Sequence, residues 1–229
     1  MLVIIRNDPE VPLGAFTGYL AEAGTPYTTI HPYAGEALPP VRFLSAVIVL
    51  GGVMGVHDTD RHPFLVTVKG FIRECVSSGI PFLGICLGGQ LLADALGGRV
   101  TPRACGEKGT LPVRLSSEGK NDPLFAGASE EFVTFQWHND CFATPEGGVL
   151  LASSAACPGQ AFRFGSNVYG LQFHPEVDRA IVSLWAGESE ESADVAARFL
   201  ADFITGEDAY RGASRLLLNN FLRIAGLTG

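Results

Sequence analysis

A change from strand to helix is expected at residues 81–98, which read PFLGICLGGQLLADALGG. The apolar run ends at Cys86, with Gly84 two positions before it and Gly88 two positions after it. A sharp strand-to-helix turn strains the backbone, and a Cβ atom at either glycine would collide with the adjoining strand or helix. The pattern G-x-C-x-G therefore predicts that Cys86 stands on such a turn.

This position would give Cys86 two chemical advantages. The N-terminus of the following helix favours a negatively charged thiolate. The free N–H groups of the first helical turn also face any oxyanion that forms beside the sulfur. Cys86 is therefore a candidate nucleophile, although a buried cysteine in an ordinary strand explains this short pattern equally well.

Three short apolar runs indicate buried parallel strands, at residues 2–5, 46–50 and 81–85. Each run is too short for a helix and ends in turn residues. Stretches with helical spacing, residues 14–24 and 63–79, precede the second and third runs. The alternation predicts an α/β fold with a doubly wound, mostly parallel central sheet and helices on both faces.

After Gly98 the pattern changes to short runs separated by turns, which predicts an antiparallel or mixed extension of the sheet. These runs are residues 110–115, 131–137, 148–154, 161–165 and 168–173. Two helices are expected near the C-terminus, broken at the segment TGED, where Asp208 would cap the second helix. We expect one domain over residues 1–229, with residues 188–229 as a helical extension.

A second motif, YGLQFHPE at residues 169–176, ends an apolar strand at His174 and Glu176. Residues two apart in an extended chain point to the same side, so the Glu176 carboxylate can orient the His174 imidazole. A thiol, a base and an orienting carboxylate form the set that nucleophilic catalysis requires. Alone, the segment H-P-E is more often a surface turn, but together with Cys86 it predicts a catalytic triad.

A third motif, VLGGVMGV at residues 49–56, follows a strand with the paired glycines Gly51 and Gly52. Ligands of open α/β sheets bind at the carboxyl ends of the strands, and glycine lets the backbone approach them. The N–H of Gly52 would complete an oxyanion hole with the N–H of Leu87. An ordinary loop is an equally good interpretation of this motif alone.

The composition argues against several classes of function. The net charge is −8 and Lys and Arg are scattered, so no basic surface for nucleic acid is expected. No stretch has the length or pattern of a membrane span or an export signal. The five cysteines form no C-x-x-C pair, which favours neither a disulfide framework nor a zinc knuckle and indicates a reducing cytoplasm.

The three motifs GGVMGV, GICLGGQLLADALGG and NVYGLQFHPE occur in an order and spacing that resemble the class I, triad-type glutamine amidotransferases. The most similar subgroup consists of stand-alone proteins like the amidotransferase domain of GMP synthase, which carry a segment like FQWHND. The likeness covers about residues 40–180. It implies that Cys86 is the nucleophile, His174 the general base and acid, and Glu176 the third triad member, with no cofactor.

The resemblance also implies a binding pocket for the substrate. The backbone N–H groups of Gly52 and Leu87 would bind the oxyanion, and Gln90 would hold the amino-acid end of glutamine. A second substrate-contacting segment would comprise Trp137, His138, Asn139 and Asp140. The sequence departs from the family at two positions. Val53 replaces a proline, which implies a looser oxyanion loop, and Asn139 replaces the glycine of stand-alone members, which affects the substrate contacts.

The implied activity is hydrolysis of the glutamine side-chain amide through a γ-glutamyl thioester on Cys86. Ammonia would pass to a separate acceptor, such as a synthase subunit, since the sequence contains no recognisable acceptor domain. One alternative is an autonomous hydrolase or peptidase that acts on γ-glutamyl compounds. Another is a non-catalytic regulatory protein of the same fold.

Other polar groups carry less information. The segment HDTDRH, residues 57–62, lies before a helix that Asp60 would cap, so no metal site is predicted there. Glu107 and Lys108 either reach the cleft or face water, and water is favoured. For His138 and Asp140, a structural role is favoured over direct contact with the substrate.

An apolar stripe near the C-terminus indicates core packing or a subunit contact in a homo-oligomer, rather than a cofactor site. The stripe consists of Leu217, Phe221, Ile224 and Leu227.

Overall fold

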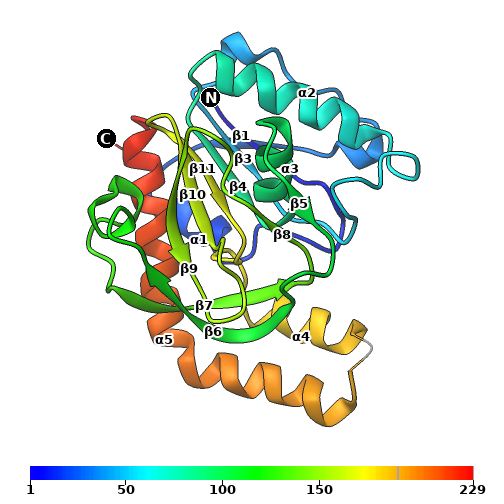
Figure 1. Cartoon of the computed structure of the whole chain (residues 1–229), viewed down its shortest axis with the longest axis vertical. Coiled ribbons are helices and arrows are strands. Elements are labelled where there is room, and N and C mark those ends of the chain that lie inside the picture. The colour runs from blue at the N-terminus through cyan, green and yellow to red at the C-terminus, as the bar shows by residue number, and fades with distance from the viewer. Residues whose placement is uncertain (190, 229) are drawn as a thin grey trace.

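The computed structural model describes residues 1–189 and 191–228 (Figure 1). Two positions of the expected C-terminal extension, Glu190 and Gly229, lie outside the described residues. The centre is a nine-stranded sheet in the order β2-β1-β3-β4-β11-β10-β9-β6-β7. Five neighbouring strands are parallel and the other four run antiparallel, which confirms the α/β fold with an antiparallel extension.

The parallel half contains the three predicted apolar strands. Its members are β1 (Leu2–Ile5), β2 (Tyr27–Ile30), β3 (Ala46–Val49), β4 (Phe82–Ile85) and β11 (Val168–Leu171). The sequence interpretation missed β2, whose residues YTTI are half exposed at the edge of the sheet. An edge strand needs no continuous apolar run, because fewer of its side chains are buried.

The antiparallel half contains four of the five short runs expected after Gly98. Its members are β6 (Glu107–Leu115), β7 (Glu131–His138), β9 (Gly148–Ser153) and β10 (Ala161–Phe164). The fifth run, residues 168–173, contains β11, which pairs with β4 in parallel and with β10 antiparallel. A separate pair, β5 (Val100–Thr101) and β8 (Cys141–Phe142), lies beside this half. Short 3-10 turns occur at Pro32–Ala34, Val41–Phe43, Gly119–Asn121 and Pro123–Phe125.

Helices cover both faces of the sheet (Figure 1). One face carries α1 (Ala15–Glu22), α4 (Arg179–Glu188) and α5 (Ala193–Ile224); the other carries α2 (Phe64–Ser77) and α3 (Leu87–Ala95). Each face of the sheet has its own hydrophobic core: the first core lies under α1, α4 and α5, and the second lies under α2 and α3. Side chains of β1 alternate between them, because Leu2 and Ile4 belong to the first core while Val3 and Ile5 belong to the second. The apolar stripe near the C-terminus packs against the first core.

The expected break near TGED is wrong, because α5 continues without interruption from Ala193 to Ile224. Asp208 therefore caps no helix. Phe203 and Tyr210, on either side of the segment, are both buried against the same core. This packing outweighs the cost of Gly206 inside a helix, which is about 1 kcal/mol.

The expected N-cap of α2 is also wrong. The helix α2 begins at Phe64 after Pro63, without a side-chain cap, so Asp60 is not its N-cap.

The expectation of no disulfide is wrong as well. Cys105 and Cys141 form a disulfide with a Cα–Cα distance of 6.0 Å. Spacing in the sequence could not indicate this pair, because the β6–β7 pairing brings the two positions together.

Within residues 1–189 and 191–228, no helix has the length and apolar character that crossing a bilayer requires.

Candidate active site

The candidate site lies where three adjacent parallel strands end. β4 lies between β3 and β11, and the register pairs Val49 with Gly84 and Ile85 with Leu171. The segments that follow these strands therefore leave the same edge of the sheet. This topology brings together the three motifs that were distant in the sequence.

Cys86 stands on a sharp turn between β4 and α3. Its backbone has φ 51° and ψ −110°, a conformation that is uncommon for a residue other than glycine. The N–H of Cys86 donates to the Leu171 carbonyl at 2.8 Å, and the Cys86 carbonyl accepts from the Gln90 N–H at 2.9 Å. These hydrogen bonds hold the strained turn and place the thiol at the N-terminus of α3.

Gly84 and Gly88 are required by close backbone contacts. A Cβ atom at Gly84 would lie 2.5 Å from the Gly88 carbonyl oxygen, and one at Gly88 would overlap the Val49 carbonyl oxygen. These backbone atoms belong to the sheet and to α3, so they cannot move aside. The steric reason predicted for the G-x-C-x-G pattern is confirmed.

His174 lies between Glu176 and Cys86. Its Nδ1 atom is 2.7 Å from Glu176 Oε1, and both side chains are buried. Gly51 lies next to both His174 and Cys86, which shows that these two side chains are close to each other. A Cβ there would lie 3.1 Å from His174 Cε1 and 3.5 Å from Cys86 Cβ. The structure thus brings a thiol, an imidazole and a carboxylate into one cluster.

The surroundings of His174 control its protonation. Burial by itself lowers the pKa of His174, but the Glu176 carboxylate and the Cys86 sulfur outweigh burial and raise the pKa to about 10. The imidazolium is therefore favoured at neutral pH. An imidazolium beside a sulfur can stabilise a thiolate and can later donate a proton to a leaving group.

The loop after β3 runs alongside the start of α3. A Cβ at Gly52 would lie 2.9 Å from Leu87 Cδ2, so the two segments expected to form the oxyanion hole are neighbours. Val53 donates its N–H to Asp8 Oδ2 at 3.3 Å. Proline, which the resemblance noted in the sequence implies for this position, lacks an N–H and could not make this hydrogen bond.

Gln172 is a neighbour of the thiol that the sequence interpretation missed. Its Nε2 atom lies 3.7 Å from Cys86 Sγ, and its Oε1 atom accepts a hydrogen bond from Gln90 Nε2 at 3.2 Å. Gln90 Nε2 also lies 3.4 Å from the Asp140 carbonyl oxygen. A signal was present in the sequence, because Gln172 precedes His174 by two residues in an extended segment.

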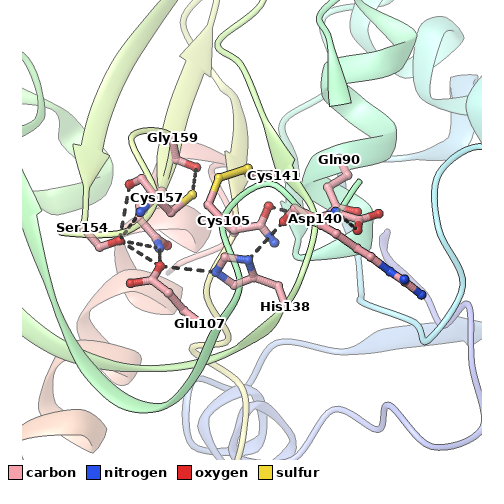
Figure 2. The surroundings of a disulfide bond; sticks show 12 residues. Gln90, Cys105, Glu107, His138, Asp140, Cys141, Ser154, Cys157 and Gly159 are labelled. Atoms are coloured by element: carbon pink, nitrogen blue, oxygen red, sulfur yellow. Dashed lines mark hydrogen bonds and ion pairs between the residues drawn. A yellow bond between two sulfur atoms is a disulfide. The ribbon is translucent and has the colours of Figure 1, made fainter. Parts of the chain in front are cut away.

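The side chains of the WHND segment point in different directions. Trp137 stacks on Phe135, with 5.8 Å between ring centroids. His138 is buried and its Nδ1 atom lies 3.1 Å from the Asp140 carbonyl oxygen, whereas Asn139 is exposed. The Asp140 carbonyl is the group of this segment that contacts Gln90, as Figure 2 shows from the side of the disulfide.

The C-terminal helices α4 and α5 also contact His174 and the residue that follows it. No local sequence pattern indicated this role. The Trp185 ring of α4 lies edge-on to the imidazole, with 4.9 Å between centroids. From α5, the Tyr210 hydroxyl donates to the His174 carbonyl at 3.1 Å and the Ser214 hydroxyl donates to the Pro175 carbonyl. These contacts link α4 and α5 directly to the H-P-E segment, residues 174–176.

The remaining polar candidates lie outside this cluster. Glu107 is buried, so the expectation that it faces water is wrong, while Lys108 forms an ion pair with Glu191 at 3.0 Å. In the HDTDRH segment, Asp58 accepts a hydrogen bond from the Gly55 N–H at 2.8 Å and pairs with Arg61. That segment therefore stabilises its own loop.

Comparison with known proteins identifies the family. The family described as glutamine amidotransferase class-I matches residues 19–180. The chain belongs to the class I glutamine amidotransferase family. The matched range contains the clustered Cys86, His174 and Glu176. A glutamine amidotransferase-like protein of Salmonella typhimurium, YfeJ, is 32% identical over 186 residues, which cover 79% of this chain and 78% of that protein.

The class I glutamine amidotransferase relatives include GMP synthases. The glutamine-hydrolyzing GMP synthase of Streptococcus thermophilus is 40% identical over 144 residues, which cover 59% of this chain. The matched part is 25% of the length of that GMP synthase. The chain is therefore related to the amidotransferase domain of a longer enzyme.

Solved structures extend the likeness to nearly the whole class I fold. The structure of a glutamine amidotransferase from Thermotoga maritima has a TM-score of 0.86 and 29% identity, covering 98% of this chain and 97% of that one. A glutamine amidotransferase from Methylobacillus flagellatus has a TM-score of 0.88 and 26% identity, covering 97% and 94%. The C-terminal helices therefore belong to an architecture found in other amidotransferases.

Proposed function

We propose that the protein hydrolyses the side-chain amide of glutamine and supplies ammonia to a separate acceptor. The observation that carries the proposal is the buried imidazole of His174, which lies 2.7 Å from Glu176 and beside Cys86 at the N-terminus of α3. Membership of the class I glutamine amidotransferase family supports glutamine as the substrate.

The proposed reaction begins when the Cys86 thiolate attacks the carboxamide carbon and a C–S bond forms. The backbone N–H groups of Gly52 and Leu87 stabilise the oxyanion, and the His174 imidazolium protonates the amide nitrogen, so that the C–N bond breaks and ammonia leaves. Water, deprotonated by the now neutral His174, then attacks the γ-glutamyl thioester and releases glutamate. Glu176 keeps the ring oriented throughout.

The proposed substrate pocket adjoins Gln90. Its side-chain amide lies between Gln172 and the Asp140 carbonyl, where it can contact the amino-acid end of glutamine. Trp137, His138, Asn139 and Asp140 complete the proposed set. Within it, His138 supports the pocket from behind by donating to the Asp140 carbonyl.

We further propose that residues 1–229 act as one domain, which the sharing of β1 between both hydrophobic cores supports. The ammonia acceptor is proposed to be a synthase subunit in trans, by analogy with the GMP synthases that this chain resembles over a quarter of their length. Neither nucleic acid nor a membrane is a proposed partner. Location in the cytoplasm is also part of the proposal.

The decisive experiment measures glutamate release from glutamine and from a panel of γ-glutamyl peptides. The wild-type protein is compared with Cys86→Ala and with Cys75→Ala, which removes another buried free thiol on α2. We expect turnover to be lost in Cys86→Ala and kept in Cys75→Ala. Equal turnover by wild type and Cys86→Ala would refute the proposal, and clear preference for a peptide would indicate an autonomous hydrolase instead.

A further inference from the structure

A second group of chemically reactive side chains lies next to the disulfide, at the end of β6 and β7 (Figure 2). Glu107 and His138 are register partners in these strands, and Cys157 comes from the loop between β9 and β10. All three are buried, and one ligand atom from each lies within 4.8 Å of the others. Nitrogen, sulfur and oxygen ligands therefore converge on one point.

The hydrogen bonding of His138 points to a cation at this position. Its Nδ1 atom donates to the Asp140 carbonyl, which leaves Nε2 as the atom that faces the cluster. Nε2 is buried without a hydrogen-bond partner among the described residues, 3.5 Å from Glu107 Oε2. A neutral ring would direct its lone pair at a carboxylate, whereas a metal ion between the two atoms would bind both.

The other ligands are arranged as in metal sites. The Oε2 atom of Glu107 accepts hydrogen bonds from Ser154 Oγ at 2.8 Å and Gln160 Nε2 at 2.6 Å, which orient the carboxylate. The backbone carbonyl that binds His138 Nδ1 fixes the ring in the same way. The Cys157 thiol donates a hydrogen bond to the Gly159 carbonyl at 3.5 Å, and a thiolate that binds a metal would give up this weak bond.

The disulfide lies next to Cys157 and forms a second group of sulfur atoms, which shares only Cys157 with the group of Glu107 and His138. One sulfur atom each from Cys105, Cys141 and Cys157 lie within 4.8 Å of one another. A disulfide is a poor ligand, but its two-electron reduction by a dithiol gives two thiols, and the dithiol becomes a disulfide. Either new thiol can then lose its proton and bind a metal beside Cys157.

We propose that the reduced protein binds one Zn²⁺ through Glu107, His138 and Cys157, with the thiolate of Cys105 or Cys141 as the fourth ligand. Borderline-soft Zn²⁺ suits this mixture of sulfur, nitrogen and oxygen donors. Thiol–disulfide exchange with a disulfide oxidant, which is reduced to a dithiol, re-forms the Cys105–Cys141 bond, removes the fourth ligand and releases the ion. The site is separate from the proposed glutaminase triad and does not depend on it.

The site has a direct structural route to the substrate pocket. The Asp140 carbonyl accepts hydrogen bonds from His138 Nδ1 and Gln90 Nε2, and Asp140 directly precedes Cys141. A bound ion would hold His138 and so fix the carbonyl that Gln90 contacts. Redox state would then affect the pocket as well as the metal content.

The test is Zn²⁺ and Co²⁺ binding by the full chain in the Cys86→Ser background, which removes the reactive thiol of the other site. After reduction with a dithiol, we expect one zinc ion per chain by elemental analysis and thiolate-to-cobalt charge-transfer absorption with Co²⁺. Cys157→Ser should weaken binding by at least about 100-fold. Absence of stoichiometric binding by the reduced protein would overturn the proposal.

Controls separate the ligands from general effects on folding. Cys75→Ser removes a buried thiol outside the cluster and should leave the metal affinity unchanged. Glu107→Gln should also weaken binding while conserving volume, which keeps the test decisive even where Cys157→Ser fails to fold. Equal affinity in Glu107→Gln and Cys75→Ser, or equal cobalt spectra before and after oxidation, would refute the ligand assignment.

Discussion

At the scale of single residues, the site depends on the charge state of His174. The Glu176 carboxylate and the Cys86 sulfur raise the pKa of this imidazole to about 10, although burial opposes them. Contact with Glu176 and Cys86 therefore makes His174 a proton donor at neutral pH, when an unperturbed histidine would be largely neutral. The sequence gives the identities of these three residues, but the shift in the pKa of His174 arises only because the fold brings them into contact.

The raised pKa of His174 predicts a pH dependence of stability. Folding favours the protonated ring, so its contribution is complete below about pH 6.5, the ordinary value for histidine. It is lost as the pH rises through about 10. We expect the unfolding free energy of wild type relative to His174→Gln to fall across this interval. Urea titrations at several pH values measure it, and a difference that grows with pH would contradict the assignment.

Glu176→Gln is predicted to reduce glutaminase kcat by about 10²- to 10⁴-fold, since a neutral amide cannot stabilise the imidazolium and favours the wrong tautomer. Steady-state kinetics with glutamine provide the measurement. Glu118→Gln, an exposed substitution on the surface, is the matched control and should leave kcat unchanged. Unaltered kcat in Glu176→Gln would exclude this carboxylate from the mechanism.

At the scale of elements, the strand-to-helix turn at Cys86 depends on close packing between strand and helix backbones. The helix α3 lies so close to β4 and β3 that a Cβ at Gly84 would meet the Gly88 backbone and a Cβ at Gly88 would meet the Val49 backbone. The strained φ of Cys86 is maintained because the hydrogen bonds on both sides of the turn are made. The two glycines thus allow the strand and the helix to present the thiol.

Two helical glycines offer a matched test of this construction. Gly88→Ala would overlap the Val49 carbonyl and is expected to destabilise the protein by about 3 kcal/mol or more. Gly70→Ala, exposed in α2 with open space around its Cβ, should instead stabilise by about 0.5–1 kcal/mol. Thermal and urea unfolding measure both. Similar stabilities of the two variants would disprove the steric argument.

At the scale of the whole molecule, the last helices of the chain help to position the site. Trp185 packs on the imidazole of His174, and Tyr210 and Ser214 bind the backbone of the H-P-E segment. Helices from both faces of the sheet, α3 on one and α4 and α5 on the other, therefore meet at the cluster of Cys86, His174 and Glu176. A change in α5 should affect activity although it lies far from Cys86 in the sequence.

Tyr210→Phe tests this long-range support. Loss of the buried hydroxyl leaves the carbonyls of His174 and Val177 without a donor and should cost about 1–3 kcal/mol of stability. We also expect a lower kcat for glutamine with little change in KM, since the base shifts rather than the pocket. Tyr33→Phe, a half-exposed control, should change neither quantity. Wild-type kcat in Tyr210→Phe would show that α5 does not position His174.

The sequence by itself determined three of the parallel strands (β1, β3 and β4), the glycines around Cys86, and the local pairing of His174 with Glu176, because these follow from periodicity and from contacts between near neighbours. Tertiary structure decided the continuity of α5, the Cys105–Cys141 pair, the burial of Glu107 and the roles of Gln172 and Tyr210. Each of these depends on which strands and helices lie side by side. Local patterns carry no information about partners that the sheet brings together from distant positions.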